Sequence, residues 1–202
     1  MEHLNGKYWE DMYQQQSTGW DLGSISTPLK GYVDGLQLHT DIDILVPGAG
    51  NGHEAAYIYE QGFTNVKVLD IAPSPLQNFQ AANPNFPKTQ LIQGNFFEHE
   101  GQYDLIIEQT FFCAIDRVLR EAYAKKMYEL LKPGGKLVGL LFGVEMALEG
   151  PPMGGNQEEY EKLFSFYFTI LKLEPCTNSI APRDGKELFM ILEKKANANV
   201  IF

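Results

Sequence analysis

Three glycines within five residues, Gly48, Gly50 and Gly52, constrain the fold of this chain most strongly. They follow an apolar run that ends at Pro47, and a helix-like pattern and a second apolar run lead from them to Asp70. Glycine lets the backbone turn sharply and approach a ligand, and the helix after it offers free N–H groups. An acid at the end of the next strand can accept hydrogen bonds from both ribose hydroxyls. The pattern therefore indicates a nucleotide-type cofactor site; the alternative is a tight strand-to-helix turn without a ligand.

The spacing of the glycines narrows the choice of cofactor. Dinucleotide sites carry G-x-G-x-x-G, in which the third glycine packs the helix close to its strand. This chain has G-x-G-x-G instead. The displaced glycine counts against a nicotinamide-dependent oxidoreductase, which stays as one alternative.

The overall composition limits the kinds of partner. The 202 residues are 44% hydrophobic, which fits one domain with a sizeable core. The formal net charge is −10, so we expect binding neither to nucleic acid nor to an anionic membrane surface. No apolar run approaches the roughly 20 residues of a membrane span, and the first residues lack the apolar core of a signal peptide. Cys113 and Cys176 are expected as free thiols, and together these features predict a cytoplasmic protein.

The apolar runs predict alternating strands and helices after residue 41. Strands are expected at 42–47, 66–70, 89–93, 103–108, 136–142, 166–173 and 187–194. Helices are expected at 53–61, 74–82, 116–131 and 157–164. The alternation indicates an α/β fold: a Rossmann-like, mostly parallel seven-stranded sheet with helices on both faces. Only a short turn-rich segment separates the last two strands, so we expect an antiparallel pair and thus one antiparallel strand.

The remaining segments are expected to complete a single domain. Its predicted parts are a helical N-terminal flap at 1–40, the Rossmann-like core at 41–195 and a loose tail at 196–202. Within the flap, Thr27 is predicted to cap a helix that has Pro28 in its first turn. The segment 143–156 is rich in Gly, Pro and Met, and we expect it to lie as a loop over the carboxyl ends of the strands.

Further motifs resemble those of one methyltransferase family. The helix-to-strand turn Leu130-Leu131-Lys132-Pro133-Gly134-Gly135-Lys136-Leu137 is common in class I S-adenosylmethionine-dependent methyltransferases. Within that superfamily the chain resembles the thiopurine S-methyltransferase family, and most of all its plant branch of thiol, thiocyanate and halide methyltransferases. The matching pieces are Trp9-Glu10, Trp20-Asp21-Leu22-Gly23, Thr27-Pro28-Leu29, the segment 46–53, Tyr103-Asp104-Leu105-Ile106, Phe111-Phe112-Cys113-Ala114-Ile115 and the segment 179–187. The resemblance extends from residue 7 to about residue 194.

The resemblance implies a single methyltransferase domain at 1–202 that uses S-adenosyl-L-methionine and releases S-adenosyl-L-homocysteine. The residues implied to bind this cofactor are Trp9, Trp20, Gly48, Gly50, Gly52, Asp70, Ile71, Asn95, Phe96 and Glu108. The glycines are expected at the amino-acid end of the cofactor, Asp70 at the ribose, and Ile71, Asn95 and Phe96 around the adenine. Trp9 and Trp20 belong to a flap that closes over the site, although they can also be plain hydrophobic anchors. Asp70 can likewise be a strand-end or helix-capping acid.

The resemblance also implies a set of catalytic residues, Glu108, Phe111, Phe142 and Arg183. Glu108 is expected to contact the amino group of the cofactor or to act as a weak base, and Phe111 to pack around the donor methyl. Phe142 stands where halide-using relatives carry a tyrosine, which leaves the acceptor open. Arg183 either attracts an anionic acceptor or pairs with a surface acid.

Two further residues invite chemical roles that we do not assign. Cys113 has no base beside it in sequence, and direct methyl transfer needs no covalent intermediate, so it is expected to be a packing residue. His53 has no second ligand at metal-site spacing, so no metal is expected.

These observations predict direct in-line transfer of a methyl group to a small, soft nucleophile: a thiol, hydrosulfide, thiocyanate or a halide. The partner is a small-molecule acceptor, and we expect a monomer. The alternatives are transfer to an oxygen or nitrogen of a small metabolite, and a non-catalytic protein that binds the same cofactor.

Overall fold

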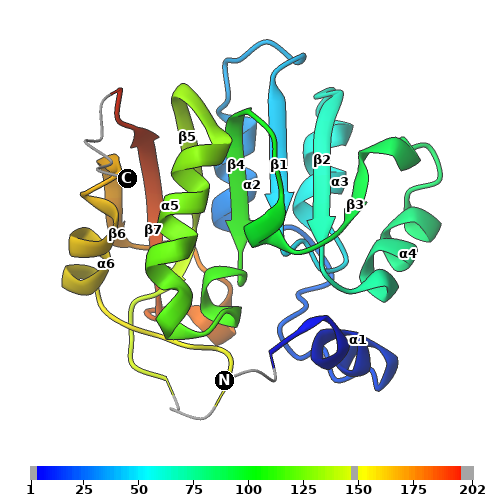
Figure 1. The fold of residues 1–202 in the computed structure, drawn as a ribbon, viewed down its shortest axis with the longest axis horizontal. Coiled ribbons are helices and arrows are strands. Elements are labelled where there is room, and N and C mark those ends of the chain that lie inside the picture. Colours follow the sequence, from blue (N-terminus) through cyan, green and yellow to red (C-terminus); the bar gives the residue numbers. More distant parts are fainter. Residues whose placement is uncertain (1–3, 147–149, 197–202) are drawn as a thin grey trace.

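The predicted seven-stranded sheet is confirmed by the computed structural model, which describes residues 4–146 and 150–196 (Figure 1). Its strands are β1 (Asp43–Pro47), β2 (Asn65–Asp70), β3 (Leu91–Gln93), β4 (Tyr103–Gln109), β5 (Leu131–Phe142), β6 (Phe168–Pro175) and β7 (Glu187–Lys194), in the order β3-β2-β1-β4-β5-β7-β6. The first five strands pair in parallel, and β7 runs antiparallel to both β5 and β6. The antiparallel pairing expected of the last two strands is therefore present.

Helices cover both faces of this sheet, as predicted. They are α1 (Gly6–Gln14), α2 (Thr27–Asp34), α3 (His53–Glu60), α4 (Pro73–Ala82), α5 (Arg120–Leu130) and α6 (Gln157–Phe164). Short 3₁₀ turns occur at Lys88–Gln90, Phe96–Glu98, Phe112–Ala114, Arg117–Leu119 and Ala181–Arg183. In Figure 1, α5 and α6 lie on one face, α2 and α3 lie behind the other, and α1 lies beyond the carboxyl ends of the strands.

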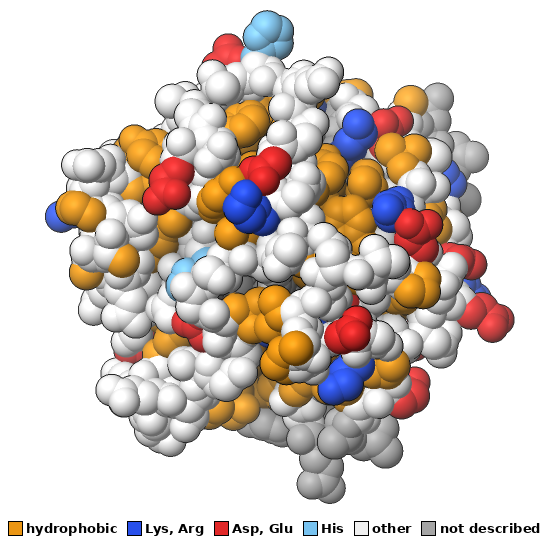
Figure 2. All heavy atoms as spheres, turned by 180° about the vertical axis from the view of Figure 1, so that it is seen from behind, with side chains coloured by type: hydrophobic (Ala, Val, Ile, Leu, Met, Phe, Trp, Pro, Cys, Tyr) orange, Lys and Arg blue, Asp and Glu red, His pale blue; other side chains and the backbone are white. Residues whose placement is uncertain are grey.

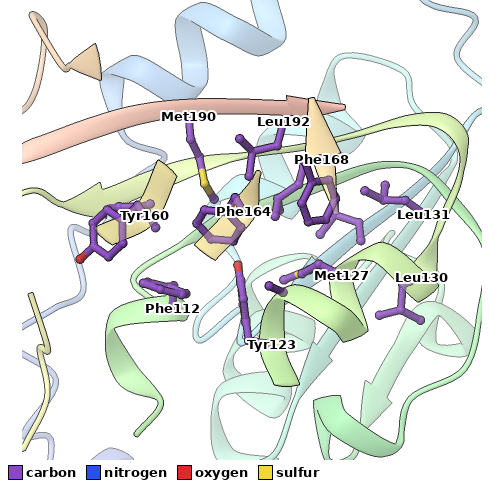
Figure 3. Packing of buried hydrophobic residues seen from close by; sticks show 14 of the residues in the cluster. Phe112, Tyr123, Met127, Leu130, Leu131, Tyr160, Phe164, Phe168, Met190 and Leu192 are labelled. Atoms are coloured by element: carbon purple, nitrogen blue, oxygen red, sulfur yellow. The ribbon is translucent and has the colours of Figure 1, made fainter. Parts of the chain in front are cut away.

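The alternation of side chains along each strand divides the hydrophobic core between the two faces. In β1, Leu45 packs with α5 and α6, whereas Ile44 and Val46 pack with α2 and α3. Figure 3 shows the first of these clusters, in which Tyr123 of α5 and Phe164 of α6 lie close together. A sheet buried on both faces has near-continuous apolar strands, which is the pattern that the sequence shows.

Three local predictions are wrong. The strand expected at 136–142 begins five residues earlier, since β5 runs from Leu131 to Phe142. The helix expected at 116–131 begins as a 3₁₀ turn, and regular α-helix runs only from Arg120 to Leu130 because β5 already begins at Leu131. Thr27 does not cap its helix: it is the first helical residue, and Ser26 occupies the cap position without a side-chain hydrogen bond. Ser26 is almost fully buried, so its hydroxyl is directed into the molecule rather than to the helix start. Pro28 does lie in the first turn.

The surface described by the structure mixes charges of both signs. On the face seen in Figure 2, Lys and Arg side chains lie singly among acidic and apolar ones rather than in a stripe. Within residues 4–146 and 150–196, the helices are all too short or too polar to cross a membrane. Residues 197–202 of the expected tail and 147–149 of the expected loop lie outside the described residues. The expectations of no nucleic acid binding and of a monomer stay predictions.

Candidate active site

A cavity of about 760 Å³ lies at the carboxyl ends of the strands, beneath the N-terminal flap. Ten of the thirteen predicted site residues line it: Trp9, Trp20, Gly48, Asp70, Ile71, Asn95, Phe96, Phe111, Phe142 and Arg183. The other three, Gly50, Gly52 and Glu108, do not line it, and Gly50 borders a smaller pocket that also touches Gly48. The structure thus brings together residues from the flap, from the ends of β2, β4 and β5, and from the last 3₁₀ turn.

The three loop glycines all adopt the left-handed conformation, with φ of 56°, 54° and 70°, but they have different neighbours. A Cβ on Gly48 would collide with the ring of Phe111, and one on Gly52 would collide with Phe79 beneath α3. Gly48 is therefore the glycine that lets the backbone form the wall of the cavity. Gly52 instead lets α3 pack closely against α4.

Asp70 joins the end of β2 to the glycine loop. Its two carboxylate oxygens accept hydrogen bonds from the N–H groups of Gly50 and Ala72, each at 2.9 Å. The side chain is 7% exposed, and this burial raises the pKa of the carboxyl group. A carboxylate has about four lone-pair positions, so Asp70 can brace the loop and still accept ribose hydroxyls from the cavity.

Asn95 and Phe96 form the neighbouring wall. The side-chain oxygen of Asn95 accepts the backbone N–H of Phe97 at 3.1 Å, and its side-chain NH₂ group donates to the Glu98 carboxylate at 3.1 Å. The amide is thus held in one orientation, and its oxygen keeps a lone pair for a donor such as an adenine amino group. Phe96 is 5% exposed and meets Phe111 edge-on at 5.0 Å, so it is a core residue whose surface reaches the cavity.

Aromatic side chains of the flap form a cluster over the cavity. The rings of Trp9 and Trp20 meet edge-on at 5.5 Å, and those of Tyr13 and Trp20 at 5.8 Å. The Trp20 indole N–H donates to the Tyr13 hydroxyl at 3.4 Å. Both tryptophans therefore pack on each other and also line the cavity, and their role toward the cofactor stays a prediction.

Two carboxylates attach the flap to the core, and the sequence analysis assigned a role to neither. Glu10 of α1 accepts the Ser74 N–H at 3.0 Å and the Ser74 hydroxyl at 2.5 Å. These hydrogen bonds lower the pKa of Glu10 and place its negative charge at the favourable amino-terminal end of α4. The contact joins residues 64 positions apart, and no local signal reveals it.

Asp21 forms the second attachment. It hydrogen bonds to His53, the first residue of α3, at 2.7 Å and to the side-chain amide of Asn51 in the glycine loop, and it accepts the Gly23 N–H at 2.7 Å. The Asp-x-Gly spacing signals the turn, but not the partners on the glycine loop. His53 is thus occupied by an acid of the flap. Among the described residues, no group of three or more His, Cys, Asp or Glu side chains is placed to hold a metal ion.

Arg183 and Phe142 lie at the opposite end of the cavity. The Arg183 guanidinium donates to the Trp20 carbonyl at 2.8 Å and pairs with the buried Glu187 at 3.3 Å. It also lies 5.8 Å from the centre of the Phe142 ring. The acid that pairs with Arg183 is therefore buried rather than on the surface, and the guanidinium still borders the cavity.

The loop after β5 covers this end of the cavity. Its described residues Met146, Pro151 and Pro152 contribute to the wall. Arg120 holds the loop in place because its guanidinium donates to the carbonyls of Met153 and Gly154, at 3.2 and 2.9 Å. The loop thus adds apolar side chains to a wall that also contains Arg183.

Cys113 lines the cavity, whereas Glu108 lies near it without lining it. Glu108 is fully buried, is separated from the cavity, and accepts the N–H groups of Phe111 and Phe112 at 3.0 and 3.3 Å. Cys113 does reach the cavity wall, but burial raises the pKa of its thiol to about 12. Its thiol donates to the Thr110 carbonyl at 3.2 Å, which fits the packing role expected of it.

Comparison with known proteins finds one family whose model matches most of this chain. The family model described as thiopurine S-methyltransferase matches residues 4–197. Two similar proteins of Arabidopsis thaliana are thiocyanate methyltransferase 1, 33% identical over 186 residues, and probable thiol methyltransferase 2, 31% identical over 185 residues. In both cases the match covers 89% of this chain and 81% of the relative.

A solved structure shows the same fold at low sequence identity. It is the 1,6-didemethyltoxoflavin-N1-methyltransferase of Burkholderia thailandensis with bound S-adenosylhomocysteine, at a TM-score of 0.74 and 18% identity. The match covers 94% of this chain and 86% of that one. The Rossmann-like fold predicted for this chain is therefore confirmed.

Proposed function

The chain belongs to the thiopurine S-methyltransferase family, and from this premise we propose that it transfers a methyl group in line to a small, soft nucleophile. The acceptors proposed are a thiol, hydrosulfide, thiocyanate or a halide. As a member of the family, the chain is an S-adenosylmethionine-dependent methyltransferase. The acceptor class and the direct transfer are the parts that we propose.

The observation that carries the proposal is the division of one cavity into a polar and an apolar end. Asp70 and Asn95 offer hydrogen-bond acceptors at one end, and Phe142 with the loop after β5 gives the other end apolar side chains, beside an Arg183 that is paired with Glu187. Gly48 lies between them, with no room for a side chain. The first end fits the nucleoside of S-adenosylmethionine, and the second fits a small acceptor with little need for hydrogen bonds.

The chemistry of a soft nucleophile fits this wall. The cofactor, when bound, supplies an activated methyl group, so the protein has mainly to align donor and acceptor and to exclude water. A thiolate or a halide needs little help from a general base. No histidine of the described residues lines the cavity, and Asp116, an acid that does line it, accepts the Val118 N–H at 3.1 Å, which favours such an acceptor over an oxygen or nitrogen nucleophile. The names of the thiocyanate and thiol methyltransferase relatives support the same acceptor class.

The proposal is tested by measuring S-adenosylhomocysteine formation by the purified protein. Parallel reactions contain hydrosulfide, thiophenol, thiocyanate, iodide or no acceptor. We expect product that depends on the acceptor. Turnover of only oxygen or nitrogen acceptors would contradict the proposed class, and cofactor binding without turnover on any acceptor would favour the non-catalytic alternative. The Asp41→Ala variant, at an exposed position away from the cavity, serves as a matched control.

A further inference from the structure

Glu108 is a buried acid for which the proposed reaction has no use. It lies near the end of β4, is 0% exposed and borders the cavity at no point. Its neighbour on β5 is Gly139, where a Cβ would come within 3.1 Å of the Glu108 Cγ atom. The sheet thus leaves room for this side chain, although burying a carboxyl group costs free energy unless it is hydrogen bonded.

The hydrogen bonds of Glu108 go to the turn that follows β4. One carboxylate oxygen accepts the N–H groups of both Phe111 and Phe112. The turn begins at Thr110, whose φ of 62° is uncommon for a residue with a side chain. A backbone in this conformation persists only when its surroundings hold it there. The carboxylate is one of the groups that do so.

This turn shapes the wall of the cavity. Thr110, Phe111 and Cys113 all line it. The Phe111 ring lies over Gly48 and meets Phe96 edge-on. A shift of the turn therefore moves the ring that lies between the glycine loop and the wall proposed for the adenine.

The charge of Glu108 depends on few neighbours. Burial is the largest influence and raises its pKa, the two backbone N–H groups and the Tyr123 hydroxyl of α5 lower it, and the charge of Glu54 on α3 raises it; the net result is a pKa of about 7. Burial raises the pKa of Tyr123 well above its ordinary value and that of Cys113 to about 12, so both stay neutral near pH 7. The cations of this region, Arg120 and Arg183, act on Cys113.

We propose that Glu108 is a positioning residue that sets the place of Phe111 against the bound cofactor by bracing the turn at 110–113, most firmly as a carboxylate. A charged acceptor forms a stronger hydrogen bond to N–H than a neutral one does. The inference rests on the proposed function only through the cofactor site, because it concerns binding and not the acceptor.

The test measures binding of two probes by calorimetry between pH 6 and pH 8.5. The probes are S-adenosylhomocysteine and 5′-methylthioadenosine, which lacks the amino-acid end. In the unchanged protein, we expect the affinity for both probes to fall by about three- to tenfold from pH 8.5 to pH 6. This change corresponds to the net free-energy contribution of about one hydrogen bond. Glu108→Gln should weaken both probes at pH 8.5 and lose this part of the pH dependence. The raised pKa of Asp70 also contributes to the pH dependence, but equally in both proteins. The difference between the pH profiles of the unchanged protein and Glu108→Gln therefore reports on Glu108.

Two results would overturn the inference, and a third would remove the cofactor site on which it rests. Weaker binding of S-adenosylhomocysteine alone would mean that Glu108 contacts the amino-acid end directly. Unchanged affinity for both probes would mean that the turn needs no brace. Failure of the unchanged protein to bind either probe would instead remove the proposed cofactor site.

A second variant keeps the inference testable if Glu108→Gln does not fold. Tyr123→Phe removes the hydroxyl that lowers the pKa of Glu108 and keeps the ring that packs in the core. The midpoint of the pH dependence should then move to higher pH. A midpoint that stays in place would contradict the proposed role of Glu108.

Discussion

At the scale of single residues, the sequence predicted the position of Asp70 at the cavity but not the buried position of Glu108. The position of Asp70 was predictable because the carboxyl ends of the strands in an open α/β sheet border the ligand site, and Asp70 ends the strand that follows the glycine turn. Glu108 was expected to end its strand in the same way, but β4 continues to Gln109 and the Glu108 side chain is buried. Successive side chains of a strand alternate between the faces, but the sequence does not show which neighbour, here Gly139, leaves space for an acid.

Asp70→Ala should weaken binding of S-adenosylhomocysteine. The change removes the acceptor proposed for the ribose hydroxyls and the brace on Gly50 and Ala72. Hydrogen bonds to charged groups contribute about 1.5–3 kcal/mol, so we expect a loss of at least about tenfold in affinity, measured by calorimetry. Affinity equal to that of the Asp41→Ala control would remove Asp70 from the site.

Glu108→Gln should stabilise the folded protein at high pH. The pKa of Glu108 is raised from 4.5 to about 7 in the fold, so the group ionises more easily in the unfolded chain. Its contribution therefore lowers stability as pH rises from about 4.5 to 7, by on the order of 3 kcal/mol at most. The amide does not titrate, so urea unfolding should show a larger gain for the variant at pH 8 than at pH 5.

The exposed Glu60→Gln variant is the control for this measurement. It should show no such pH-dependent gain. A stability difference between Glu108→Gln and the unchanged protein that is the same at both pH values would contradict the raised pKa.

At the scale of elements, the strands were predictable and the docking of the flap was not. Runs of apolar residues fix strands that are buried on both faces. The flap is held instead by single polar contacts between distant segments, such as that of Arg183 with the Trp20 carbonyl, 163 residues apart. Neither periodicity nor local motifs encode such pairs.

Glu10→Ala should speed the release of S-adenosylhomocysteine. The variant loses both hydrogen bonds to Ser74, which hold α1 against the start of α4. We expect about a three- to tenfold higher dissociation rate, the effect of one net hydrogen bond. Stopped-flow tryptophan fluorescence can follow it because Trp9 and Trp20 lie in the flap.

The matched control is Glu60→Ala, an exposed helical glutamate on α3. It should release the product at the unchanged rate. Equal rates for Glu10→Ala and Glu60→Ala would show that α1 does not limit release.

At the scale of the whole molecule, the net charge of −10 opposes the approach of anionic acceptors. The nearby cation Arg183 is already paired with Glu187, so its attraction for an anion is reduced. The sequence predicted the charge, but the buried pairing of Arg183 appeared only with the fold. Long-range repulsion is therefore expected to outweigh local attraction.

This balance predicts that salt raises kcat/KM for anionic acceptors and leaves it unchanged for neutral ones. For thiocyanate or iodide, kcat/KM should rise by about twofold between 0.01 and 0.15 M ionic strength, because the Debye length shortens from about 30 to 8 Å. For a neutral thiol, measured below its pKa, the value should stay constant. Potassium acetate can set the ionic strength. A fall in kcat/KM for thiocyanate would show that attraction by Arg183 dominates.

The two ends of the cavity are encoded by separate stretches of the chain. The end proposed for the nucleoside comes from the tips of β1 to β3, whereas Phe142, the loop after β5 and Arg183 make the other end. Loops on a rigid sheet tolerate exchange far better than strands do. Related enzymes are then expected to change acceptor without changing the cofactor site. Replacing the loop after β5 with that of a homologue should change the preferred acceptor and leave cofactor affinity unchanged.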